Sequence, residues 1–193
     1  MIRTKHNIKL AQSAGFCYGV NRAVKTTKEL RADNPQKNVY VLGELIHNAH
    51  VIGELTELGI KTVNELPENS DGYCVIRSHG VSPQTINEIN EKGFEILDMT
   101  CPDVKKVQQK AIELVKDNYM LLILGKETHP EVIAIKANAM EYGNNILVIN
   151  DVDDFKNKLD KIKENKKVGI VVQTTQKIDF LKNMVRNILP IVF

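Results

Sequence analysis

Two cysteines open two similar stretches of this sequence. Cys17 begins C-Y-G-V-N-R-A-V-K-T-T-K-E-L and Cys101 begins C-P-D-V-K-K-V-Q-Q-K-A-I-E-L, with a valine, a glutamate and a final leucine at matching positions. Each cysteine precedes an apolar pattern with helical spacing, and a helix N-terminus favours a thiolate, the form that binds iron or zinc. A single such cysteine is more often a buried apolar residue. Because the position is repeated in two copies, we predict that both cysteines are metal ligands.

Three of the five histidines directly follow apolar runs that predict strands. His47 ends V-L-G-E-L-I-H, His129 lies in I-L-G-K-E-T-H-P-E, and His79 follows Y-C-V-I-R-S. Imidazole side chains together with the amides of helix N-termini suit phosphate or diphosphate, so we expect one shared anion site. His6 and His50 lack this context and are expected at the surface.

Other polar residues stand beside these histidines. Glu131 follows His129 by two residues and is a candidate general acid, although a solvated first-turn carboxylate that complements the helix dipole is an equal alternative. Thr174 and Thr175 occupy in the second copy the place of His79 in the first, so their hydroxyls are expected to face the same site, Thr174 beside the proton donor and Thr175 as a hydrogen-bond partner of the substrate. Cys74 lies inside an apolar run and is expected in the core.

Strands and helices are expected to alternate along the whole chain. The patterns predict strands at 8–11, 38–42, 60–63, 73–77, 94–97, 120–124, 146–149 and 168–172. They predict helices at 20–31, 47–58, 102–116, 130–141, 151–164 and 178–188, and one that begins at Pro83 after the cap Ser82. This alternation indicates an α/β fold with small, mostly parallel sheets covered on both faces. We expect two similar units, residues 1–100 and 101–193, with the polar groups collected at the carboxyl edges of the sheets.

Composition excludes several classes of function. The chain has 193 residues, a formal net charge of +2 and 5% aromatic residues, so neither nucleic acid nor an anionic membrane is an expected partner. No apolar run approaches the ~20 residues of a membrane span, and the first residues lack the apolar core of a secretion signal. Three widely spaced cysteines do not form a disulfide framework and are typical of cytoplasmic thiols.

Six ordered segments, G-F-C-Y-G-V, E-L-I-H-N, S-H-G-V-S, D-M-T-C-P, T-H-P-E-V and V-V-Q-T-T, together resemble the LytB family of 4-hydroxy-3-methylbut-2-enyl diphosphate reductases. The resemblance covers nearly the whole chain. It implies an oxidoreductase of the methylerythritol phosphate route to isoprenoids that contains a 4Fe–4S cluster. Such an enzyme removes the allylic hydroxyl of its diphosphate substrate with two electrons from a ferredoxin- or flavodoxin-type donor, and yields isopentenyl and dimethylallyl diphosphate.

The resemblance also implies a role for each matched residue. The cluster ligands are Cys17 and Cys101, and the diphosphate ligands are His47, His79 and His129. The acid of the proton relay matches Glu131, with Thr174 and Thr175 beside it. Ala134 stands where the family usually has glycine, a minor departure.

One departure from the family is large. The family has three α/β units around its cluster, with a third cysteine that opens the third unit and a Ser-Asn-rich diphosphate loop, and this sequence contains neither. The spacing of the first two copies predicts the next cysteine just beyond Phe193. We therefore expect about two-thirds of a reductase, nearly inactive by itself, with an exposed apolar face that promotes self-association. The alternatives are a non-catalytic diphosphate-binding module and a structural protein that binds zinc through Cys17, Cys101 and nearby histidines.

Overall fold

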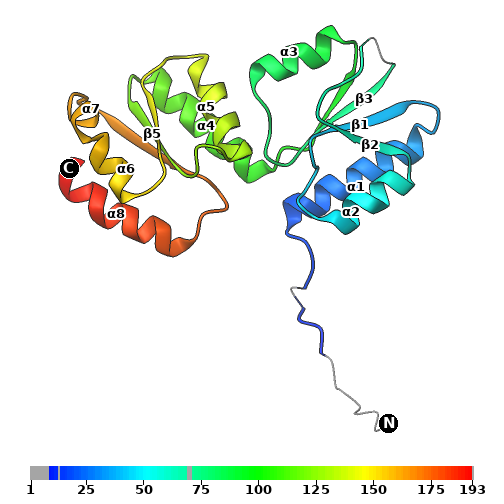
Figure 1. Cartoon of the computed structure of the whole chain (residues 1–193), viewed down its shortest axis with the longest axis horizontal. Helices are drawn as coiled ribbons and strands as arrows, with labels where there is room; N and C mark the ends of the chain where they lie inside the picture. The colour runs from blue at the N-terminus through cyan, green and yellow to red at the C-terminus, as the bar shows by residue number, and fades with distance from the viewer. Residues whose placement is uncertain (1–8, 13, 69–70, 193) are drawn as a thin grey trace.

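The computed structural model describes residues 9–12, 14–68 and 71–192. Within these residues the chain forms two parallel β-sheets, each with helices packed on both faces (Figure 1). The predicted α/β class is therefore confirmed. The expected boundary before Cys101 falls in the segment that joins the last strand of the first sheet to the first helix beside the second.

The first sheet has four parallel strands in the order β2-β1-β3-β4. Its strands are β1 (Asn38–Leu42), β2 (Ile60–Val63), β3 (Gly72–Ile76) and β4 (Glu95–Asp98). Its helices are α1 (Tyr18–Asp33), α2 (Ala49–Glu57) and α3 (Pro83–Glu91). Helices α1 and α2 cover one face of the sheet, and α3 covers the other (Figure 1).

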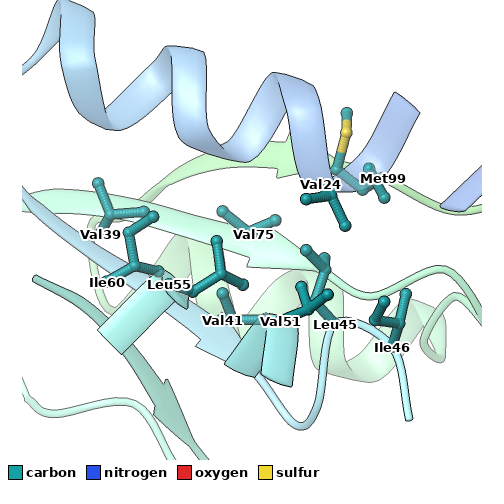
Figure 2. Close-up of a cluster of buried hydrophobic side chains, with 11 residues drawn as sticks. Val24, Val39, Val41, Leu45, Ile46, Val51, Leu55, Ile60, Val75 and Met99 are labelled. Atoms are coloured by element: carbon teal, nitrogen blue, oxygen red, sulfur yellow. The ribbon is translucent and has the colours of Figure 1, made fainter. Parts of the chain in front are cut away.

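Alternation along β1 places its side chains in two separate cores. Val39 and Val41 are fully buried against α1 and α2, and Figure 2 shows them beside Leu55 and the other residues of that cluster. Tyr40 points to the opposite face, where its ring meets that of Phe94 edge-on at a centroid distance of 5.6 Å. Burial of large apolar side chains on both faces holds the sheet rigid. This sheet is therefore a firm base for the loops at its carboxyl edge.

The second sheet has three parallel strands in the order β6-β5-β7. Its strands are β5 (Met120–Leu124), β6 (Ile146–Ile149) and β7 (Val168–Val172). Helices α4 (Pro102–Lys116) and α5 (Pro130–Met140) cover one face, where Leu121 and Ile123 point. The other face carries α6 (Val152–Asn157), α7 (Leu159–Lys163) and α8 (Ile178–Val192). All five residues of β5 are buried, as expected for the central strand of a parallel sheet.

In both sheets, the two strands that follow the first strand along the chain are added on opposite sides of it. After β1 the chain adds β2 on one side and then β3 on the other, and after β5 it does the same with β6 and β7. Ligands of open parallel sheets bind in the crevice outside the carboxyl ends of the strands at such points. The histidines and threonines proposed for the site lie in the loops after β1, β3, β5 and β7, and Glu131 lies in the first turn of the helix that follows β5.

The first part of the predicted helix 47–58 is a loop instead. The Asn48 side chain accepts hydrogen bonds from the backbone N–H groups of His50 and Val51, so α2 begins at Ala49. His47 therefore lies before the helix, in the loop that follows β1. This position leaves its ring free to turn toward the neighbouring loops.

Two further expectations differ from the structure. The single helix expected at 151–164 is divided into α6 and α7, because Lys158 leaves helical geometry with φ −100° and ψ 3° and donates from Nζ to the carbonyl of Val148. The predicted strand at 8–11 is absent from residues 9–11, and Ile8 lies outside the described residues. Within the described ranges, no helix has both the length and the apolar character needed to cross a membrane.

Candidate active site

The two matched cysteines each stand at the N-terminus of a helix. Cys17 caps α1 and is exposed, and Cys101 caps α4 and is half-buried. The Cys101 sulfur lies against the first turn of α1, since a Cβ added to Gly19 would sit 2.8 Å from it. The fold therefore brings the two helix N-termini together, and a glycine at position 19 makes the close approach possible.

Tyr18 connects the same two helix ends. The neighbouring Asp103 carboxylate, with smaller contributions from burial and from Cys101, raises the pKa of Tyr18 to about 12. Cys74, in contrast, is fully buried in β3, where burial raises the pKa of its thiol to about 12. The prediction that Cys74 is a core residue is confirmed.

The three predicted histidines form one cluster. The ring centroids of His47 and His79 are 5.2 Å apart, and those of His79 and His129 are 5.3 Å apart. His79 follows β3 and His129 follows β5, so the cluster spans both sheets. Asn138 of α5 donates to the carbonyl of Val81 at 3.0 Å and fixes the second unit against the first beside this cluster.

The histidines differ in their hydrogen bonds. Nδ1 of His129 accepts from the backbone N–H of Glu131 at 3.2 Å, so the neutral ring carries its proton on Nε2. Nδ1 of His47 lies 2.9 Å from a carboxylate oxygen of Glu44. Nδ1 of His79 is buried without a hydrogen-bond partner among the described residues. A buried polar nitrogen without a partner is costly, and it is a natural contact for a bound ligand.

The environment of the cluster opposes protonation of His79. Burial first, and then the charges of His129, Arg77 and His47, lower the pKa of His79 to about 4. Burial is also the main cause of the lowered pKa of His129, and Glu131 partly opposes it. At neutral pH His79 is therefore an uncharged ring that can donate or accept a hydrogen bond.

This shift predicts a pH dependence of stability. Above pH ~6.5 His79 is neutral in both the folded and the unfolded chain, so its titration does not change the free energy of unfolding there. Between that pH and about 4 only the unfolded chain takes up the proton, so the free energy of unfolding falls as the pH is lowered. The slope is below about 1.4 kcal/mol per pH unit, because the ring is partly exposed and screened by solvent. Urea unfolding at several pH values measures it, and His79→Gln should make the curve flatter; an unchanged slope in that variant contradicts the assignment.

Glu131 is fully buried, and Thr174, in the loop after the neighbouring strand β7, binds its carboxylate. The backbone N–H of Thr174 donates to Oε1 at 2.6 Å, and the Thr174 hydroxyl donates to Oε2 at 2.9 Å. Glu131 starts α5 after β5 and Thr174 follows β7, so this contact closes the crevice between neighbouring strands. Because a solvated first-turn carboxylate would be exposed, the structure excludes that alternative for Glu131.

The hydroxyl of Thr174 should contribute measurably to stability. In Thr174→Val the shape is kept, but one oxygen of the buried carboxylate loses its only side-chain donor among the described residues. We expect the free energy of unfolding to fall by about 1–3 kcal/mol, measured by urea denaturation. Thr175→Val is the matched control and should have a smaller effect, because the Thr175 hydroxyl accepts from the neutral amide of Gln173 and does not bind a buried carboxylate; equal effects in the two variants would contradict this account.

Thr175 does not contact Glu131. Its hydroxyl accepts instead from the side chain of Gln173 at 2.7 Å, and Gln173 Oε1 accepts from the backbone N–H of Lys126 at 3.1 Å. Gln173 is nearly buried and ties the loop after β7 to the loop after β5. Gln173 was not among the predicted site residues, although it stands in the same V-V-Q-T-T segment as Thr174.

The two remaining histidines, His6 and His50, were expected at the surface. The His50 ring is exposed and lies 3.1 Å from Glu54, as expected for a surface residue, and His6 is outside the described residues. Over residues 9–12, 14–68 and 71–192, no group of three or more His, Cys, Asp or Glu side chains is arranged to hold a metal ion. Cys17 and Cys101 are therefore the two candidate thiolate ligands that these residues offer.

The fold and the site together define a class of protein. It is an α/β protein with paired cysteines at helix N-termini and a histidine cluster shared between two parallel sheets. The chain belongs to the LytB protein family, whose family model matches residues 8–191.

Two curated relatives are named 4-hydroxy-3-methylbut-2-enyl diphosphate reductase. The protein from Pelobacter propionicus is 37% identical over 176 residues, which are 91% of this chain and 60% of the relative. The protein from Aquifex aeolicus is 34% identical over 182 residues, which are 94% of this chain and 61% of the relative. The chain thus spans about 60% of the length of these relatives.

Solved structures agree with this assignment. A structure titled as (E)-4-hydroxy-3-methyl-but-2-enyl diphosphate reductase, the terminal enzyme of the non-mevalonate pathway, superposes with a TM-score of 0.85 at 34% identity, over 96% of this chain and 64% of that chain. The structure of the corresponding reductase from Plasmodium falciparum superposes with a TM-score of 0.80 at 28% identity, over 94% of this chain and 56% of that one. The fold of this chain is therefore that of these reductases over their matched part.

Proposed function

We propose that this chain carries the diphosphate-binding and proton-delivering part of a 4-hydroxy-3-methylbut-2-enyl diphosphate reductase, an oxidoreductase of isoprenoid precursor biosynthesis. The main support is the arrangement of three histidines from both units beside the buried Glu131–Thr174 pair. The names of the relatives support the same reaction. Three free cysteines suit a reducing compartment, so we place the protein in the cytoplasm.

In the proposed reaction an allylic C–O bond breaks, and the hydroxyl leaves as water. Two electrons and two protons are consumed, one proton for the water and one for the carbon skeleton of isopentenyl or dimethylallyl diphosphate. His47, His79 and His129 bind the diphosphate oxygens through ring N–H groups. Glu131 delivers the proton to the departing hydroxyl, and Thr174 holds the carboxyl group in position.

The cysteines suit an iron–sulfur cofactor. Cys17 and Cys101 begin adjacent helices, carry free thiols and are at least partly exposed, so both can serve as thiolate ligands of a 4Fe–4S cluster. When bound, the cluster would supply the electrons, received from a ferredoxin- or flavodoxin-type donor protein. Because the matched motifs provide two thiolates of the family's three, we expect weak cluster retention and little turnover from this chain by itself.

The surface of the second unit supports the expectation of self-association. Two large apolar side chains of α8, Ile178 and Val185, are exposed and lie about two helical turns apart. Such residues often mark contact surfaces when they are contiguous. We propose that they promote pairing of chains in solution, and a monodisperse monomer by light scattering at high concentration would argue against it.

Metal analysis after anaerobic preparation tests the proposed function against the two alternatives. We expect substoichiometric iron with labile sulfide, lost in Cys17→Ser and Cys101→Ser and retained in Cys74→Ser, because Cys74 is buried in β3. Stoichiometric zinc would favour a structural zinc protein. Absence of metal together with tight diphosphate binding would favour a non-catalytic binding module.

A further inference from the structure

The Cys101 sulfur lies in a space that a glycine leaves open. A Cβ at Gly19 would lie 2.8 Å from Sγ and 3.5 Å from Cβ of Cys101, and the first of these distances is too short for a real side chain. Gly19 is buried in the first turn of α1, and its φ angle lies outside the left-handed region, so its backbone conformation does not require glycine. Glycine is also less favourable than alanine in a helix. The neighbouring sulfur therefore explains the missing side chain.

A hydrogen bond joins the same two segments one helical turn further along α1. Nη2 of Arg22 donates to the backbone carbonyl of Thr100 at 2.8 Å, and Thr100 directly precedes Cys101. Residues three positions apart lie on the same face of a helix, so Gly19 and Arg22 present one surface of α1 to this segment. The two contacts together fix residues 100–101 against the start of α1.

Other hydrogen bonds fix the backbone around Cys101. Its N–H donates to the carbonyl of Ser78 at 2.9 Å, in the loop that follows β3. The carboxylate of Asp98 accepts from the backbone N–H of Thr100 at 2.8 Å. Because the backbone is held in this way, the direction of the thiol depends on what the side chain meets on α1.

The position of Cys17 depends on the same helix. Cys17 is the N-cap of α1, two residues before Gly19, and α1 is packed on the first sheet through Ala23 and Val24. The contact of Gly19 with Cys101 therefore also determines how close the two thiols lie.

We propose that Gly19 and Arg22 are positioning residues that hold the Cys101 thiol beside the N-terminus of α1, at a separation from Cys17 that a single iron–sulfur cluster can bridge. The proposal rests on the function proposed above, and neither residue is among the predicted ligands. Gly19 acts by leaving room for the sulfur, and Arg22 acts by holding the carbonyl that precedes it.

Cross-linking of the metal-free 193-residue chain with dibromobimane tests the positioning. This reagent becomes fluorescent when it joins two neighbouring thiols, and Cys74 is fully buried. We expect it to join Cys17 to Cys101 in the unchanged chain. In Gly19→Ala the sulfur has to turn away from the new methyl group, so the ratio of cross-linked to singly alkylated chain should fall about 10-fold. Gly53→Ala is the matched control, because Gly53 lies in α2 and a Cβ there would meet nothing within 4 Å.

Arg22 variants and thermal unfolding separate positioning from a purely structural role. Arg22→Leu should lower the cross-linking ratio, and Arg22→Lys should restore part of it, because an ammonium group can still donate to the Thr100 carbonyl. Gly19→Ala should keep the melting temperature of the unchanged chain or raise it, since alanine favours the helix. After anaerobic reconstitution, iron content and the visible absorption of the cluster should follow the cross-linking ratio.

Equal cross-linking ratios in Gly19→Ala, Arg22→Leu and the unchanged chain overturn the proposal. If Gly19→Ala does not fold, the Arg22 pair decides, and a loss in Arg22→Leu that Arg22→Lys does not restore overturns the role of Arg22. Absence of a cross-link between Cys17 and Cys101 in the unchanged chain overturns the positioning but not the proposed function. Efficient cross-linking without any uptake of iron overturns the proposed cofactor but not the positioning of the thiols.

Discussion

In a complete reductase built on this chain, Glu131→Gln should reduce turnover by roughly 10²–10⁴-fold while substrate binding largely survives. Glutamine keeps the size of the side chain and removes the acidic proton. It also fits the same contacts, since its oxygen can accept from the Thr174 backbone and the Thr174 hydroxyl can turn to accept from its amide. The loss should therefore reflect proton delivery and not a change of structure.

Steady-state rates and substrate affinity, measured on the same preparation with equal cluster content, check this prediction. His50→Ala is a suitable control, because the His50 ring is exposed beside Glu54 and does not belong to the histidine cluster. Near-normal turnover of Glu131→Gln with an intact cluster would contradict the assignment. The proton donor would then have to be sought among the histidines.

Replacing His79 by alanine should have the second largest effect, on binding. His79 is the central ring of the cluster, within 5.2 Å of His47 and 5.3 Å of His129 between centroids. Loss of a hydrogen bond to a charged phosphate oxygen should weaken pyrophosphate affinity about 10- to 100-fold. Unlike His129, it caps no helix, so the loss should not include the cost of a missing cap.

Calorimetry with pyrophosphate measures the effect, and His50→Ala is the matched control. The His50 ring is exposed beside Glu54, so its removal should leave the affinity unchanged. Equal affinities of His79→Ala and the unchanged chain would show that the cluster does not hold the diphosphate. A loss of affinity in His79→Ala and a loss of turnover in Glu131→Gln would together distinguish residues that bind the diphosphate from the residue that delivers a proton.

The sequence by itself determined the α/β class and most of the elements. Period-two and helical apolar patterns are local properties, and β1, β2, β5, β6, β7 and α4 have the predicted bounds. Several other elements differ at their ends by a few residues, and in two places a single side chain explains the difference. Because Asn48 caps α2, this helix begins at Ala49 and not at His47. Because Lys158 leaves helical geometry, the helix predicted at 151–164 forms two helices, α6 and α7.

The duplication also predicted which residues would lie at the carboxyl ends of strands. Cys101, His79, His129 and Glu131 could be named because each stands where an apolar run meets a helix or a turn. Motif resemblance then suggested their roles. Neither source could show that Thr175 turns to Gln173 while Thr174 binds Glu131, because adjacent threonines look equivalent in a sequence.

Only the tertiary structure decided which of these residues meet. Glu131 and Thr174 are far apart in the chain and touch because β5 and β7 are neighbours in the sheet order β6-β5-β7. Gln173 was passed over for the same reason: nothing local marks it, and its role comes from its contacts with Lys126 and Thr175, which tie the loop after β7 to the loop after β5. Whether a side chain is buried or has a hydrogen-bond partner depends on all its neighbours in space, whereas a sequence pattern records only the neighbours along the chain.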